Sequence, residues 1–237
     1  MRVSVLLLLL CILAACSTAA PFVTTVGILK PGATLAVRAG SGTVNAYQPA
    51  AGQPRDLFTI AATALPKSSP APPRLRPMPH GVFVTAPQPL SSLLVRVPDG
   101  VTLDVDSRKG DVNVTDIPGS ARILAERGNV NVMLPGYAQA ATGEGNVSVT
   151  MGAATWPGTL RFSTRRGDIV LRISAKAAFG VHLHTGGGVL FTDFGLRGTS
   201  SGGAETIDGS VNGGTTQRID VETSSGAIRL LRLQPQP

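Results

Sequence analysis

The chain has 237 residues, a formal net charge of +7 and only two cysteines. Aromatic residues make up 4% of it, whereas glycine (28) and proline (18) are abundant, a composition typical of β-rich proteins with many turns. Because Cys11 and Cys16 both lie in the first sixteen residues, a domain built from the rest excludes disulfides, cysteine-ligated metals and cysteine nucleophiles.

The first residues have the pattern expected of an export signal. Arg2 precedes an apolar run from Val5 to Leu13, which is too short to span a membrane. The run ends in Leu13-Ala14-Ala15-Cys16. This sequence resembles the lipobox of bacterial lipoproteins, in which a peptidase cuts before the cysteine and the thiol then carries diacylglycerol.

We therefore expect a lipoprotein signal peptide at 1–15, lipidation of Cys16 and a lipidated tether at 16–24. The alternative is an ordinary secretory signal, cut after Ala19 or Ala20. Both interpretations export the protein to the bacterial cell envelope. Because the residue after Cys16 is not the Asp that retains many lipoproteins at the inner membrane, the outer membrane is favoured where one exists.

A β-strand-repeat domain is expected over 25–237. Its front half contains four stretches that read as strands, at 33–37, 57–60, 81–84 and 93–97. Residues 65–79 hold six prolines and predict a surface loop with polyproline character.

A short phrase recurs in the second half: a glycine, usually an Asp or Asn, then an alternating apolar pair. The copies lie 17–22 residues apart, which is the spacing of one coil of a β-solenoid. Each glycine is expected to open a strand at a corner where no Cβ fits. The predicted corner glycines are Gly110, Gly128, Gly145, Gly167, Gly187, Gly209 and Gly226.

The alternation within each copy turns one set of side chains inward and the other outward. Val130 and Val132 are expected in the core, and Asn131 outside, where stacked asparagines can form an amide ladder. A single coil cannot bury its own apolar face, so several must stack. The predicted fold class is all-β: a flattened parallel β-solenoid of stacked repeats of about 17–22 residues, with a two-sheet β-sandwich as the alternative.

The strand that leads into these repeats also carries a family resemblance. Leu94-Val95-Arg96-Val97-Pro98-Asp99-Gly100-Val101-Thr102-Leu103-Asp104-Val105 resembles the "V-x-V-P-x-G-x-x-L-x-V" strand of an adhesin family of bacterial β-strand-repeat envelope proteins, a domain of unknown function. The resemblance covers about Ala33 to Leu233. It implies a long all-β repeat domain, often exported or lipid-anchored, without an assigned activity.

Two pairs of side chains on predicted strands could carry chemistry. Asp104 and Asp106 share one outward face about 7 Å apart, a separation seen in glycosidase acid pairs, although solvent-facing acids are far commoner. His182 and His184 share an outward face in the same way, but a metal needs a third ligand and none can be named. We therefore predict no catalytic residue, no metal and no cofactor.

Two further motifs have structural explanations. Gly198-Thr199-Ser200-Ser201-Gly202 matches the G-x-S-x-G nucleophile elbow, which requires a strand before it and a helix after it. Its Gly/Ser-rich surroundings instead predict a long corner between coils. Trp156, the only tryptophan, lies in a Thr-Trp-Pro-Gly stretch and is expected to cap a turn rather than contact a ligand.

The positive charge suggests an anionic partner. Export argues against nucleic acid, which leaves anionic envelope polymers, another envelope protein and the membrane itself as expected partners. Several arginines fall at polar positions of alternating strands, where they would bind phosphates or carboxylates or only prevent edge-to-edge association. The candidate polyanion-binding surface is Arg122, Arg161, Arg165, Arg166 and Arg172.

The expected function is therefore that of a non-enzymatic, membrane-anchored lipoprotein that acts as a binding, adhesin-like or scaffolding module. One alternative is a β-helix enzyme acting on envelope or extracellular polysaccharide, which would need convergent carboxylates from adjacent coils. Another is a purely structural spacer.

Overall fold

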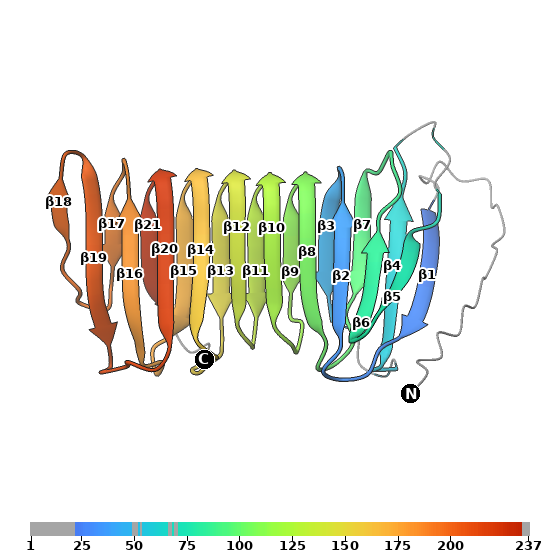
Figure 1. The fold of residues 1–237 in the computed structure, drawn as a ribbon, viewed down its shortest axis with the longest axis horizontal. Coiled ribbons are helices and arrows are strands. Elements are labelled where there is room, and N and C mark those ends of the chain that lie inside the picture. Colours follow the sequence, from blue (N-terminus) through green and yellow to red (C-terminus); the bar gives the residue numbers. More distant parts are fainter. Residues whose placement is uncertain (1–21, 49–51, 53, 66–67, 69–70, 234–237) are drawn as a thin grey trace.

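The computed structural model describes residues 22–48, 52, 54–65, 68 and 71–233, whose regular secondary structure is entirely β-strand. The strands form two facing sheets along one long axis (Figure 1). Cys16 and residues 1–21 lie outside the described part. Residues 22–24, predicted to belong to the tether, form the start of the first strand.

The two sheets contain ten and eleven strands. In spatial order, sheet A contains β1 (Phe22–Ile28), β4 (Leu57–Thr63), β7 (Ser92–Arg96), β3 (Thr43–Tyr47), β9 (Val112–Thr115), β11 (Val130–Leu134), β13 (Val147–Met151), β15 (Ile169–Ser174), β21 (Ile228–Leu233) and β17 (Leu190–Thr192). Sheet B contains β18 (Thr199–Ser201), β19 (Ala204–Val211), β16 (Phe179–Thr185), β20 (Arg218–Ser225), β14 (Thr159–Arg166), β12 (Ala138–Glu144), β10 (Ala121–Arg127), β8 (Thr102–Lys109), β2 (Thr34–Ala39), β6 (Gly81–Thr85) and β5 (Arg74–Met78).

Most of the molecule is a flattened solenoid in which each coil contributes one strand to each sheet. β10 lies parallel between β8 and β12 in sheet B, and β11 lies parallel between β9 and β13 in sheet A. This confirms the predicted all-β solenoid. The parallel pairing of successive coils distinguishes the fold from the sandwich alternative. The stacked strand pairs are β6/β7, β2/β3, β8/β9, β10/β11, β12/β13, β14/β15, β20/β21 and β16/β17.

The coils do not stack in chain order. The last pair, β20/β21, is inserted between β14/β15 and β16/β17. Similarly, β2/β3 is inserted between β6/β7 and β8/β9. Antiparallel strands complete the two ends of the solenoid: β1, β4 and β5 at one end, and β18 and β19 at the other (Figure 1).

The core lies between the two sheets and is made of side chains aligned in register. Val130 pairs with Val112 on one side and Val147 on the other, and the row continues through Ile169 to Ile228. All five are at most 1% exposed. The predicted inward direction of Val130 and Val132 and the outward direction of Asn131 are confirmed.

The corner glycines stack directly on one another. A Cβ at Gly128 would lie 2.2 Å from the carbonyl oxygen of Gly110, and one at Gly145 would lie 2.1 Å from that of Gly128. No other residue fits such a corner without moving the neighbouring backbone. The same close stacking continues along this corner, in the order Gly42, Gly110, Gly128, Gly145, Gly167, Gly226 and Gly188.

Two of the seven glycines predicted to lie at stacked corners do not lie there. Gly188, not Gly187, stacks on Gly226, because the Gly186–Gly188 run allows a shift of one residue. Gly209 lies inside antiparallel strand β19, where a Cβ would be 2.9 Å from Leu196 Cδ2.

At four of these corners the Asp or Asn after the glycine links neighbouring coils. In each case a backbone N–H donates to the side chain of the previous coil. The bonds run from Asn129 to Asp111 Oδ1 (2.7 Å), from Asn146 to Asn129 Oδ1 (3.0 Å) and from Asp168 to Asn146 Oδ1 (2.8 Å). Only an acceptor oxygen is required, so Asp and Asn serve equally. The two acids are also separated by two asparagines, which avoids like-charge stacking.

Two predicted loops contain strands. Within the proline-rich segment 65–79, Arg74–Met78 forms edge strand β5, since a strand with only one neighbour tolerates Pro77. Within Gly198–Gly202, Thr199–Ser201 forms β18, which pairs antiparallel with β19. This segment is therefore part of the end of the solenoid rather than a corner between coils.

Candidate binding surface

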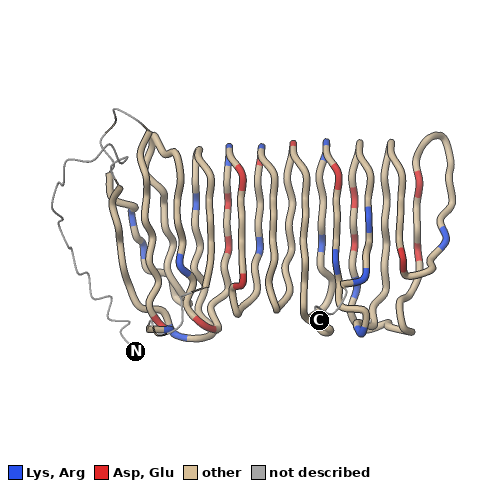
Figure 2. The backbone as a smooth tube through the Cα atoms, turned by 180° about the vertical axis from the view of Figure 1, so that it is seen from behind, with Lys and Arg blue, Asp and Glu red and all other residues tan. Residues whose placement is uncertain are grey.

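The outer faces of the two sheets differ in chemistry. On sheet A, Asn131 Nδ2 donates to Asn113 Oδ1 (3.0 Å) and Asn113 Nδ2 donates to Asn45 Oδ1 (2.9 Å). This is the predicted amide ladder, and Ser148 follows it in register. On sheet B, arginines and acids occupy the corresponding positions. Figure 2 shows how positively and negatively charged positions are interleaved along the stack.

Three of the predicted arginines lie on the outer face of sheet B. Arg122 is on β10, and Arg161 and Arg165 are on β14. All three are exposed, and none forms an ion pair with another residue of the described part of the chain. They flank the outer face of β12, which carries no charge before the corner. We call this surface the β12 strip; it consists of Arg122, Gln139, Ala141, Gly143, Arg161 and Arg165.

The other two predicted arginines do not belong to this surface. Arg166 is at the corner, where its guanidinium lies 3.2 Å from Glu144, which also lies 3.7 Å from Arg127. Arg172 is on β15 and therefore on the outer face of sheet A. Of the five candidate arginines, therefore, three share one face; Arg172 is separated from them because the two strands of a coil belong to opposite sheets, and Arg166 because it is at the corner.

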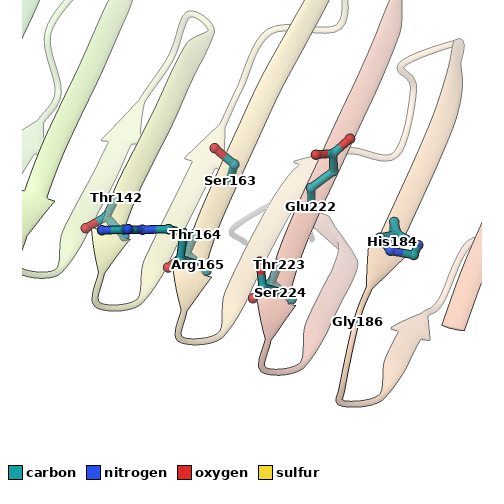
Figure 3. Close-up of a pocket in the computed structure, with 9 residues that line it drawn as sticks. All are labelled: Thr142, Ser163, Thr164, Arg165, His184, Gly186, Glu222, Thr223 and Ser224. Atoms are coloured by element: carbon teal, nitrogen blue, oxygen red, sulfur yellow. The ribbon is translucent and has the colours of Figure 1, made fainter. Parts of the chain in front are cut away.

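A shallow hollow of about 340 Å³ opens beside the β12 strip (Figure 3). Among its lining residues, Gly186 presents no side chain to it. The side chain of Arg165 lies across β12, with Nη2 only 2.9 Å from where a Cβ of Gly143 would be. We call this feature the β20 hollow; the residues that matter below are Ser163, Arg165, His184, Gly186, Glu222 and Ser224.

The two aspartates on β8 are not arranged as a catalytic pair. Asp106 accepts a hydrogen bond from Arg38 Nε at 3.1 Å. Partial burial raises the pKa of Asp104 above its ordinary value; the charge of Arg122 opposes this effect and that of Asp106 adds to it. Both acids lie on one strand, and neither faces a second acid across a cleft.

The raised pKa of Asp104 gives a testable pH dependence. Its ionised form is disfavoured in the folded state, so the charge costs stability above the folded pKa, and this cost disappears as the pH falls through it. We expect Asp104→Asn to be more stable than wild type at about pH 7, by less than about 1 kcal/mol because the site is partly solvated. The difference should vanish near the ordinary aspartate pKa of about 4. Thermal melts across this range test it; a variant destabilised at neutral pH would contradict it.

The two histidines on β16 are held by β19. Nδ1 of His182 is 2.8 Å from Asp208 Oδ1, and Nδ1 of His184 is 3.0 Å from the Thr206 hydroxyl. The rings are parallel, with centroids 6.4 Å apart. Among the described residues, no group of three or more His, Cys, Asp or Glu side chains could hold a metal ion.

Trp156 has a structural position. It is 6% exposed, lies 5.5 Å from the Phe179 ring, and its backbone nitrogen donates to Gln217 Oε1 (2.9 Å). Gln217, itself buried, also donates to Ala178 O (2.7 Å). Trp156 thus supports the insertion of β20 rather than forming part of an exposed site.

The G-x-S-x-G match does not form a nucleophile elbow. Ser200 lies in β18, and the next element is strand β19, not the helix that an elbow requires. In the part of the chain that the structure describes, no helix is long and apolar enough to cross a membrane.

Sequence reasoning missed Glu222 as a site residue. Nothing in the residue types around it marks Glu222 as part of a site, because its neighbours are set by the order in which the coils stack. In the structure β20 lies between β14 and β16, which places Glu222 beside Ser163 and His184. The backbone N–H of Ala227 donates to Asp168 Oδ1 (2.8 Å), which joins the β20/β21 coil to the β14/β15 coil.

Comparisons with known proteins identify a family and a structure of similar fold. The model of the Toastrack DUF4097 family matches residues 99–231. The chain is similar in fold to a structure from Clostridium sporogenes described as a "putative cell adhesion protein", with 12% identity, coverage of 90% of this chain and 100% of that one, and a TM-score of 0.50. A Bacteroides fragilis structure described as a "putative adhesin" shares 9% identity over 90% of this chain and 98% of that one, with a TM-score of 0.35. The search of curated proteins found no match. With more than half of its length matched by the family model, the chain belongs to the Toastrack DUF4097 family.

Proposed function

We propose that the protein is a non-enzymatic, lipid-anchored envelope protein that binds anionic polymers through the outer face of sheet B. The observation that supports this most strongly is the β12 strip, where three exposed arginines flank the part of β12 that is uncharged, before Glu144 at the corner, and form no ion pair within the described residues. A binding role is also in keeping with the name given to the Clostridium sporogenes structure.

The spacing of these arginines suits an extended ligand. Arg122 and Arg161 lie on either side of Gln139 in register, so their Cα atoms are about 10 Å apart, two strand spacings. A guanidinium binds a carboxylate or a phosphate through two parallel hydrogen bonds. A flat array of such groups would hold a repeating polyanion better than it would a small molecule.

Binding by the β12 strip should depend steeply on salt. We expect the domain lacking residues 1–16 to co-sediment with polygalacturonate or with phosphatidylglycerol vesicles at low ionic strength. Binding should weaken markedly by about 0.15 M salt, since exposed charges are then screened over about 8 Å. Absence of binding to both probes at low salt would refute the proposed function and leave the role of a structural spacer.

The proposed anchor has a separate test. We expect a clickable fatty acid to label the wild-type protein in bacterial cells, and Cys16→Ser to abolish the label. Cys11→Ser is the matched control, because that residue would leave with the signal peptide. Equal labelling of wild type and Cys16→Ser would show that Cys16 is not the attachment site.

A further inference from the structure

We propose that the β20 hollow binds an acidic sugar unit, so that the preferred polyanion is a uronate-containing polysaccharide rather than an anionic lipid surface. This inference rests on the proposed function and specifies its ligand. It depends on side chains that β14, β20 and β16 bring together and that lie far apart in the sequence.

Two glycines at the same level of the stack shape the hollow and its surroundings: Gly186, just after β16, lines it, and Gly143 lies on β12, with β14 and β20 between them. Gly186 has no side chain and lies close to β20, where a Cβ would be 2.8 Å from the Ser224 carbonyl oxygen, and Gly143 allows the Arg165 side chain to lie flat across β12. Its volume of about 340 Å³ is at the lower end of the range of small-molecule sites, about 300–1,000 Å³. A sugar ring lying on the surface requires such a depression, whereas a flat lipid surface does not.

The polar groups around the hollow have unused hydrogen-bonding capacity. Glu222 forms no ion pair and no side-chain hydrogen bond with the described residues, and Arg165 forms no ion pair with them. In Figure 3 the Arg165 guanidinium extends towards Thr142, away from Glu222. His184 is bonded to Thr206 through Nδ1, and its Nε2 is the remaining hydrogen-bonding atom.

These groups match the chemistry of a uronate. A carboxylate substituent would bind the Arg165 guanidinium. Sugar hydroxyls would donate to the Glu222 carboxylate and exchange hydrogen bonds with His184 and Ser163. The distance from β12 to β16 is three strand spacings, about 14 Å, so the ligand would be a short stretch of polysaccharide lying across the strands. The charge of Glu222 would repel phosphates and uronate carboxylates alike, but only the sugar offers hydroxyl groups that donate hydrogen bonds to it.

Glu222→Gln separates the two ligands by the sign of its effect. The substitution removes a negative charge, so a purely electrostatic surface should bind every polyanion as tightly or more tightly. If Glu222 accepts sugar hydroxyls, loss of its charge should instead weaken binding to polygalacturonate about tenfold, the effect of one charge-assisted hydrogen bond. Binding to phosphatidylglycerol vesicles should not weaken. Glu126→Gln, which removes an exposed charge on β10, is the matched control and should weaken neither.

The experiment measures binding of the domain lacking residues 1–16 to polygalacturonate, to its methyl ester and to phosphatidylglycerol vesicles at low salt. We expect the methyl ester to bind poorly, because it offers no carboxylate to Arg165. Unchanged or tighter polygalacturonate binding by Glu222→Gln would overturn the sugar site while leaving the proposed function intact. Wild-type binding to vesicles alone would do the same, and binding to no probe would overturn both.

Discussion

Val130→Asp should unfold the domain or bring it close to unfolding. Val130 is 0% exposed, and its neighbours in register are Val112 and Val147, so a carboxylate there would lack both water and a partner. Such a buried charge costs several kcal/mol, comparable with the whole stability of a typical domain, about 5–15 kcal/mol. We expect loss of the cooperative thermal transition, or a large fall in its midpoint, measured by circular dichroism.

Asn131→Asp is the matched control, one residue along the same strand. Asn131 is exposed, and the substitution removes only the hydrogen bond from its Nδ2 to Asn113 Oδ1. We expect this to lower the free energy of unfolding by about 1 kcal/mol. If the two variants melted at the same temperature, the assignment of the inner and outer faces of β11 would be wrong.

Gly145→Ala should have the second largest effect. The new Cβ would lie 2.1 Å from the carbonyl oxygen of Gly128, and the φ angle of +143° lies in a region that alanine rarely adopts. Backbone strain of this kind costs about 1–3 kcal/mol, and overpacking adds about 1–3 kcal/mol. We expect Gly145→Ala to lose about 2–6 kcal/mol of unfolding free energy in chemical denaturation.

Gly158→Ala separates the two contributions. Gly158 also has a positive φ, +63°, but a Cβ there meets nothing within 4 Å. Gly158→Ala should lower the free energy of unfolding only by the strain of holding alanine in the left-handed conformation, about 1–2 kcal/mol. Similar losses in the two variants would show that close stacking of the corner glycines does not limit the distance between coils.

The repeat could be predicted from the sequence because its physical requirements involve residues close together in the chain. A corner with no space for a Cβ requires glycine, and the side-chain oxygen that accepts a hydrogen bond from the next coil requires Asp or Asn. Gly128-Asn129 and Gly167-Asp168 therefore predict the same turn. The period-two alternation after each corner then fixes which side chains enter the core. These requirements predict the solenoid and the inward direction of Val130 without any knowledge of long-range contacts.

The order of the coils could not be read in this way. Each coil presents the same corner and the same apolar rows, so sequence spacing favours the next copy along the chain as the neighbour. The observed insertion of β20 depends on distant contacts, in which the Gln217 amide nitrogen donates to Ala154 O (3.0 Å) and Ala178 O (2.7 Å). The β20 hollow therefore escaped sequence analysis, because Glu222 and Arg165 become neighbours only through that insertion.

The most direct test of the binding surface compares charge reversal on the two faces. Arg122→Glu/Arg161→Glu changes the outer face of sheet B, and Arg172→Glu/Arg229→Glu makes the same change in net charge on the outer face of sheet A. The measurement is co-sedimentation with polygalacturonate at low salt. We expect the sheet B variant to lose binding and the sheet A variant to retain most of it. Equal loss in both variants would contradict the account, because it would make binding a consequence of net charge rather than of the β12 strip.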